Sequence, residues 1–273
     1  MKRRRKRKLK IILLITFSFL FLSLSTSYSL LSQELDISST ATISYREQTG
    51  GDFVGGIVDE DDGLIENEDG SSNFVGDEGA AVNNFIQIPG DSYLWRILSI
   101  DTSGNLKIIR NRDESLISVF STSNNADDWT NTTVFQNLQS FYQEYLSSYS
   151  DVIVQNPEWL LTEASNSSPT AVTITGSYTD SPIGLIRNDE VLNSSGSGDA
   201  NNGSVSSWLN DGYQWTMTIV SNRSGRQAWR MNGGRFRNSG VNTQTVYRPV
   251  IYLKSTVTFS GGTGTDEDPF VVQ

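Results

Sequence analysis

The sequence has 273 residues, with 21 Lys and Arg, 31 Asp and Glu, and neither His nor Cys. Without Cys there is no disulfide framework, thiol nucleophile or zinc–thiolate site, and without His there is no Ser-His-Asp triad or imidazole base. A hydrophobic content of 36%, including 10% aromatic residues, is enough for a sizeable core. No residue pattern indicates a catalytic activity.

The N-terminal segment has the pattern of a secretory signal. Residues 2–10 (KRRRKRKLK) contain eight cations, and residues 11–22 (IILLITFSFLFL) are uncharged. Small residues follow at Ser27 and Ser29, and signal peptidase selects small residues next to its cleavage site. We therefore predict cleavage after Ser29, which leaves Leu30 as the first mature residue.

The alternative is an uncleaved anchor over residues 11–28, for which the apolar run is short. In both cases the cationic end stays inside the cell, so we expect a secreted or cell-surface protein that contacts a membrane only through this segment. Residues 30–273 contain 13 Lys and Arg against 31 Asp and Glu, a net charge of −18. This charge disfavours nucleic acid as a partner, and export without Cys is typical of a Gram-positive cell exterior.

An acidic stretch follows the leader. Residues 39–46 alternate as an edge strand would, and residues 47–78 contain eleven acids and no base. Such a segment repels itself and has few large apolar groups, so residues 30–80 are predicted to form a solvated linker or stalk. The acids could also bind calcium, but their spacing around Gly63 and Gly70 does not fit an EF-hand. We expect no other cofactor.

The pattern of elements becomes regular after residue 83. Residues 85–88, 93–100 and 106–111 are strand-like, and Asp101–Gly104 predicts a hairpin turn between the last two. The main helix is expected over residues 131–147. Asn131 or Thr132 would cap it, and its apolar face would consist of Val134, Leu138, Phe141, Tyr142 and Tyr145.

The later elements are short. Pro249 predicts an edge strand or a strand start, and residues 193–204 read as a flexible loop. Apolar segments are expected over 158–161 and 183–186, a short helix from Asn188 or Asp189, and strands over 215–220, 228–232 and 247–254. Many short strands with one main helix predict an α+β domain of twisted antiparallel sheets over residues 81–273.

The order of several motifs resembles a family of exported proteins of Gram-positive gut-type bacteria. The motifs are YLWRILSIDTSGNLKII (93–109), IGLIRNDEV (183–191), WLNDGYQWTMT (208–218), QAWRMNGGRF (227–236), YRPVIYLKS (247–255) and GGTGTDEDPFVV (261–272). The late half is also similar, more distantly, to the C-type lectin-like and formylglycine-generating-enzyme type of fold. The enzymes of that type need cysteines or copper ligands, and this chain has neither. The resemblance therefore implies a lectin-like scaffold for binding outside the cell.

Arginine gathers late in the chain. Seven of the thirteen cations outside the leader lie between Arg223 and Lys254, and no acid occurs between Asp211 and Asp266. Guanidinium groups bind carboxylate, sulfate and phosphate bidentately. The candidate ligand-binding residues are Arg226, Arg230, Arg235 and Arg237, with an anionic glycan, a wall polymer or a surface protein as partner. The alternative is that these cations are neutralised within the molecule.

Trp129 lies among polar residues and is the candidate exposed aromatic platform, whereas Trp208, Trp215 and Trp229 have apolar neighbours and are expected in the core. Adjacent acids such as Asp127 and Asp128 do not indicate a glycosidase, because neighbours on a strand face opposite ways. We therefore expect a non-enzymatic binding or adhesion protein. The alternatives are a structural subunit that assembles through its acidic and Arg-rich poles, and a carbohydrate-active enzyme. The sequence does not indicate an oligomeric state.

Overall fold

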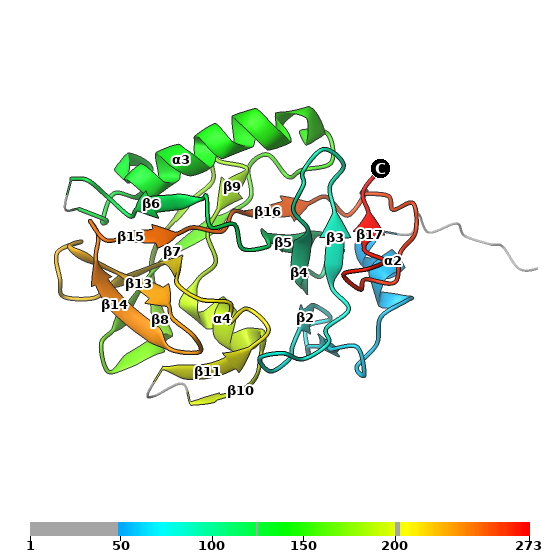
Figure 1. Ribbon diagram of the computed structural model, residues 1–273, viewed down its shortest axis with the longest axis horizontal. Helices are drawn as coiled ribbons and strands as arrows, with labels where there is room; N and C mark the ends of the chain where they lie inside the picture. Colours follow the sequence, from blue (N-terminus) through cyan, green and yellow to red (C-terminus); the bar gives the residue numbers. More distant parts are fainter. Residues whose placement is uncertain (1–48, 124, 200–202) are drawn as a thin grey trace, which may run out of the picture. The chain divides into compact units, whose positions relative to one another are not determined.

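Two β-sheets contain most of the described secondary structure (Figure 1). The computed structural model describes residues 49–123, 125–199 and 203–273, all of which belong to one compact unit. Strands account for 37% and helices for 15% of these residues, which confirms the α+β class. The signal sequence with Ser27, Ser29 and Leu30, and the edge strand expected over 39–46, lie outside the described residues.

The first sheet has eight strands. Its main path is β1 (Leu64–Glu66), β2 (Ser72–Phe74), β4 (Trp95–Ile100), β5 (Leu106–Arg110), β16 (Val250–Leu253) and β9 (Ile183–Gly184). β3 (Phe85–Gln87) also pairs with β4, and it pairs in parallel with β17 (Phe270–Val271). The strand beginning at Val250 follows Pro249 directly, so the prediction of a strand start is confirmed, whereas an edge position is wrong because β16 lies between β5 and β9.

The second sheet has seven strands and is mixed. Its path is β14 (Phe236–Gly240), β13 (Gln227–Met231), β12 (Gln214–Val220), β15 (Gln244–Val246) and β6 (Ile117–Val119), with β7 (Trp159–Ser165) beside β12 and β8 (Ser168–Tyr178) beside β7. β12 pairs in parallel with both β15 and β7, so the prediction of antiparallel sheets holds for most strand pairs of this sheet but not for these two. The chain reaches these neighbours through long crossovers, as parallel pairing requires.

The main helix is built from three consecutive segments and is preceded by a short 3₁₀ turn. A 3₁₀ turn, η1 (Trp129–Asn131), precedes α3 (Thr133–Phe141), which continues as the π-helical η2 (Tyr142–Leu146) and the 3₁₀ turn η3 (Ser147–Tyr149). The hydroxyl of Thr132 caps α3 by accepting from the Phe135 amide. The predicted apolar face is buried as far as Tyr142, but Tyr145 is 46% exposed. A π-turn rotates less per residue than an α-helix, so it carries Tyr145 away from that face.

The acidic linker predicted up to residue 80 is not observed over the described residues. Thr49 and Asp52 form a capping box at the start of α2 (Gly50–Gly55), and β1 and β2 continue the first sheet. Gly50 and Gly51 are buried, and a Cβ at Gly50 would lie 2.4 Å from the Val257 side chain. These glycines permit close packing, and the predicted domain boundary at residue 81 is wrong because the described residues before it belong to the same compact unit.

The prediction of a flexible loop over residues 193–204 is also wrong in part. α4 (Asn188–Asn193) begins at a predicted position, and it leads into β10 (Ser195–Asp199), which pairs with β11 (Ser204–Ser207). The hairpin turn at 101–104 is confirmed, because the Gly104 amide donates to the Asp101 carbonyl. Trp95, Trp159 and Trp215 are among the largest fully buried side chains of the core. Within the described residues, no helix is both long and apolar enough to cross a membrane.

Candidate functional site

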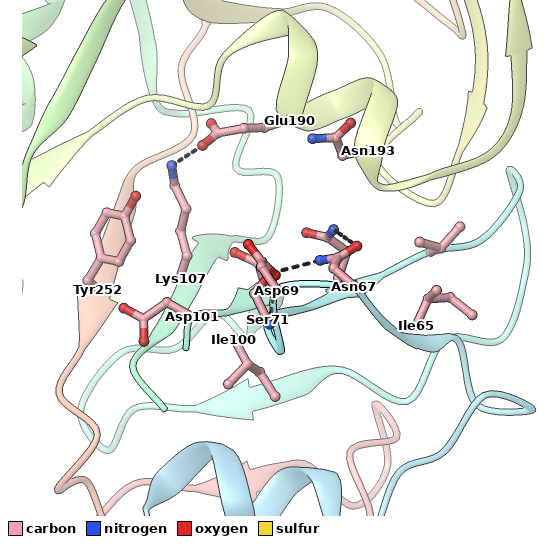
Figure 2. A pocket seen from close by; sticks show the side chains of 13 residues that line it. Ile65, Asn67, Asp69, Ser71, Ile100, Asp101, Lys107, Glu190, Asn193 and Tyr252 are labelled. Atoms are coloured by element: carbon pink, nitrogen blue, oxygen red, sulfur yellow. Dashed lines mark hydrogen bonds and ion pairs between the residues drawn. The ribbon is translucent and has the colours of Figure 1, made fainter. Parts of the chain in front are cut away.

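A row of side chains crosses five strands of the first sheet and forms the floor of a cavity of about 580 Å³ (Figure 2). The row is set by strand register, which places Asn73 opposite Ser99, Ser99 opposite Lys107, and Lys107 opposite Tyr252. Ile65 continues the row beyond Asn73. A register shift between Ile97 and Ser99 in β4 aligns Ser99 with Lys107. Residues distant in sequence thereby share one face of the sheet.

The β1–β2 hairpin supplies one side of the cavity. Ile65 of β1 and Asn73 of β2 are register partners and face the cavity together. Asn67, Asp69 and Ser71 of the turn between the strands, and Val75 after β2, line it as well. The hairpin is held by its own side chains. The Asn67 Nδ2 donates to Ser71 Oγ at 2.9 Å, and the Ser71 hydroxyl donates to Asp69 Oδ1 at 2.6 Å. The polar groups of this wall are therefore held in place.

Helix α4 supplies the opposite wall. Glu190 and Asn193 project from it toward the cavity (Figure 2). Glu190 forms an ion pair with Lys107 and a second one with Arg187 at 3.1 Å, and it also accepts from the Arg187 amide. Arg187 in turn binds Asp189 through two hydrogen bonds of 2.9 and 3.0 Å. This network fixes the start of α4 above the sheet.

Two aromatic rings enclose the Lys107 ammonium. Its Nζ lies 4.9 Å from the centroid of the Tyr252 ring and 5.3 Å from that of Trp159. The two rings contact each other edge to face at 5.3 Å. Trp159 is buried, whereas Tyr252 is partly exposed and lines the cavity. Cation–π and edge contacts of this kind hold Tyr252 in one orientation.

The electrostatics of the Lys107–Glu190 pair keep both groups charged. Burial acts to lower the pKa of Lys107, but the neighbouring Glu190 carboxylate outweighs it and raises that pKa. Burial acts to raise the pKa of Glu190, but Lys107 and Arg187 outweigh it and lower that pKa. The hydrogen bonds from Ser71 lower the pKa of Asp69 as well. Near neutral pH the cavity therefore has one neutralised cation and ionised carboxylates.

The predicted arginines are partly brought together. Cross-strand register places Arg230 directly opposite Arg237, and Arg235 lies two residues from Arg237 on the same face. Arg226 is exposed in the turn before β13, outside this set. Of the other late cations, Arg248 is buried and donates to the Arg110 carbonyl and to Asp211, and Lys254 donates to the Asp151 carbonyl.

Trp129 is not an exposed platform. Its side chain is only 4% exposed and packs against Phe120 and Phe135, so that prediction is wrong. The chain after the polar Asp127 and Asp128 turns inward, and the indole contributes to the core. Trp208, Trp215 and Trp229 are buried as expected.

Calcium ligands do not gather in the described part of the chain. No group of three or more Asp or Glu residues there has the geometry of a metal site. Asp59 instead caps its own turn, where its carboxylate accepts from the Asp61 amide. Asp101, at the edge of the cavity, accepts from the Ser103 and Asn105 amides and from the Asn105 side chain. These carboxylates stabilise turns.

The cavity was missed by the sequence prediction. The signal was the polar alternation of Asn67, Asp69, Ser71 and Asn73, which is hidden inside a stretch that reads as an acidic linker. Comparison with family models, with curated proteins and with solved structures finds no match for this chain. The function must therefore be inferred from the chemistry of the described residues.

Proposed function

We propose that this protein is an exported, non-enzymatic binding protein whose cavity holds a neutral saccharide. The observation that carries the proposal is the concave surface formed by the Asn73–Ser99–Lys107–Tyr252 row and by the hairpin residues beside it. Concave sites with a few fixed polar groups are the usual form of small-ligand sites.

The lining suits hydroxyl groups. A sugar hydroxyl both donates and accepts, and so does the amide side chain of asparagine. Asn67, Asn73 and Asn193 supply three such amides, and Asp69 supplies a carboxylate acceptor. The partly exposed Tyr252 ring offers an apolar face on which the C–H groups of a pyranose can pack.

The charge of the cavity favours a neutral ligand. Among the described residues that line the cavity, Lys107 is the one cation, and Glu190 already neutralises it. Asp69 and Asp101 add negative charge. An anionic ligand would meet uncompensated carboxylates, whereas a neutral polyol can donate to them.

The same carboxylates argue for binding over hydrolysis. A glycosidase needs an acid whose pKa is raised, so that it holds a proton near neutral pH. The pKa values of Glu190 and Asp69 are lowered instead, and Asp101 is engaged in its turn. These groups are suited to accept hydrogen bonds from a ligand.

The proposal has two further parts, namely that the protein is exported to the cell surface and that its domain is related to C-type lectin-like domains. Export rests on the cationic and apolar leader over residues 2–22. The lectin-like kinship rests on the more distant similarity of the late half of the chain to that type of fold. The α+β class of the described residues is compatible with it.

The test is a neutral-glycan array followed by calorimetric titration of the best ligand into the full chain. The double variant Asn73→Ala/Asn193→Ala, which keeps the Asn67–Ser71 hydrogen bond of the hairpin, should bind at least ~10-fold more weakly, because each lost hydrogen bond contributes about 1 kcal/mol. Gln136→Ala, an exposed change on α3, is the matched control and should bind as the unmodified chain does. A chain that binds no neutral glycan, or a double variant of unchanged affinity, would refute the proposal.

A further inference from the structure

The β13–β14 hairpin presents three arginines on one face, away from the cavity residues. Gly233 and Gly234 both have positive φ, of 50° and 76°, as the two central residues of a tight I′-type hairpin turn require. The Asn232 amide donates to the Arg235 carbonyl and the Arg235 amide to the Asn232 carbonyl. This register fixes Arg230 opposite Arg237. We call Arg230, Arg235 and Arg237 the arginine face.

The arrangement is electrostatically unfavourable for the protein alone. Like charges directly opposite each other on neighbouring strands destabilise a sheet. Arg235 and Arg237 are exposed, and within the described residues no ion pair joins any arginine of this face to a carboxylate. Among the described residues, the internal neutralisation considered above as the alternative is therefore not observed for these three arginines.

An aromatic ring lies at the end of the face. Tyr213 is 43% exposed, and the Arg230 guanidinium lies 4.5 Å from its ring centroid. Arg230 also donates to the Thr245 hydroxyl at 3.3 Å, which holds it over the ring. Guanidinium groups beside an exposed ring combine bidentate anion binding with a surface for a sugar ring.

We propose that the arginine face binds an acidic polysaccharide that carries carboxylate groups. Carboxylates match the planar fork of the guanidinium. Such a polymer has about one charge per acidic sugar, which is a lower charge density than that of a nucleic acid. Residues 30–273 have a net charge of −18, and this charge repels a nucleic acid more strongly than it repels the polysaccharide. The proposal is independent of the neutral-sugar cavity, because it uses none of the residues that line it.

The experiment measures binding of the full chain to polygalacturonate at low and at physiological salt. Arg235→Gln/Arg237→Gln should weaken binding by ~10-fold or more. The matched control, Arg223→Gln/Arg226→Gln, removes the same charge from exposed positions outside the face and should change binding less than ~2-fold. Arg235→Lys/Arg237→Lys keeps the charge but loses the planar fork of the guanidinium. Its affinity for polygalacturonate should lie between those of the two glutamine double variants. Thermal melting of each variant confirms folding.

Three outcomes would overturn the proposal. The first is no binding of polygalacturonate at low salt. The second is an equal loss in the two glutamine double variants, which would indicate a response to net charge alone. The third is equal or tighter binding of single-stranded DNA at the same charge concentration, which would assign the face to nucleic acid. Failure of the cavity variants on the glycan array would leave these results unaffected, so the two proposals can fail separately.

Discussion

The acidic segment and the arginine segment are both runs of one charge, but the structure uses them differently. In residues 49–78 the backbone completes the first sheet, and polar residues such as Asn67 and Asn73 line the cavity while the acids Glu66 and Glu68 are exposed. In residues 223–254 the backbone also forms strands, but Arg235 and Arg237 themselves are the exposed feature. A charge run therefore does not report whether the backbone is folded.

The two regions also differ in how charge is compensated. In the cavity, the Lys107 and Glu190 charges are removed from water and paired with each other. On the arginine face the charges remain solvated and unpaired within the described residues. Stability should therefore depend strongly on the charges of the cavity and weakly on those of the face.

The largest effect is expected from breaking the buried pair. Glu190→Gln leaves the Lys107 ammonium buried beside Arg187 without its carboxylate, and should lower the free energy of unfolding by about 3–5 kcal/mol. Lys107→Met should cost less, because Arg187 still neutralises Glu190. Urea denaturation measures both.

The Arg112–Glu114 pair, whose carboxylate is exposed, is the matched control for that measurement. The Glu114 side chain is 75% exposed, so water screens its charge and Glu114→Gln should leave the free energy of unfolding nearly unchanged. If Glu190→Gln lowers the free energy of unfolding no more than Glu114→Gln does, the Lys107–Glu190 pair contributes little to stability. The proposed contrast between cavity and face would then be wrong.

A smaller effect is expected on acidification, through a second buried network of the first sheet. Burial acts to raise the pKa of Asp113, but hydrogen bonds from Ser115 and from Arg110 outweigh it and lower that pKa from 3.8 to about 2. A lowered pKa in the folded state stabilises the protein above about pH 4, and this contribution is lost as the pH falls toward about 2.

Melting temperatures recorded between pH 5 and pH 2 test this prediction. Asp113→Asn should melt lower at pH 5 and approach the unmodified chain near pH 2, because the unmodified carboxyl is then protonated. At pH 5 the exposed Asp180→Asn should melt close to the unmodified chain, because it removes no buried contact. Parallel curves for Asp113→Asn and the unmodified chain would exclude Asp113 as a source of the pH dependence.

Several elements could be predicted from the sequence because their signals are local. The β4–β5 hairpin has alternating apolar residues around an Asp-to-Gly turn, and α3 has a capping threonine followed by apolar residues at helical spacing. The β1–β2 hairpin was missed because each of its strands has three residues, too few for a pattern to outweigh the surrounding acids. Pairing with β4 stabilises it, and that pairing is tertiary.

The cavity could not be predicted for a related reason. Asn73, Ser99, Lys107 and Tyr252 meet only because three strand registers and one shift within β4 align them. Each register joins two strands, so the sequence around any one of the four residues does not determine which residue will lie opposite it. The arginine face was easier to anticipate, because a Gly-Gly turn between Arg230 and Arg235 brings the arginines together within eight residues.

The smallest expected effect is on the arginine face itself. Arg237→Gln removes one of two cations that face each other across β13 and β14, so it should raise the free energy of unfolding by about 0.3 kcal/mol at low salt. The gain should disappear near 1 M salt, where the Debye length is about 3 Å. Arg226→Gln, at an exposed position outside the face, should give no gain at either salt concentration. A destabilised Arg237→Gln would mean that an unrecognised carboxylate already compensates the face, and the site would no longer have charge available for an acidic polysaccharide.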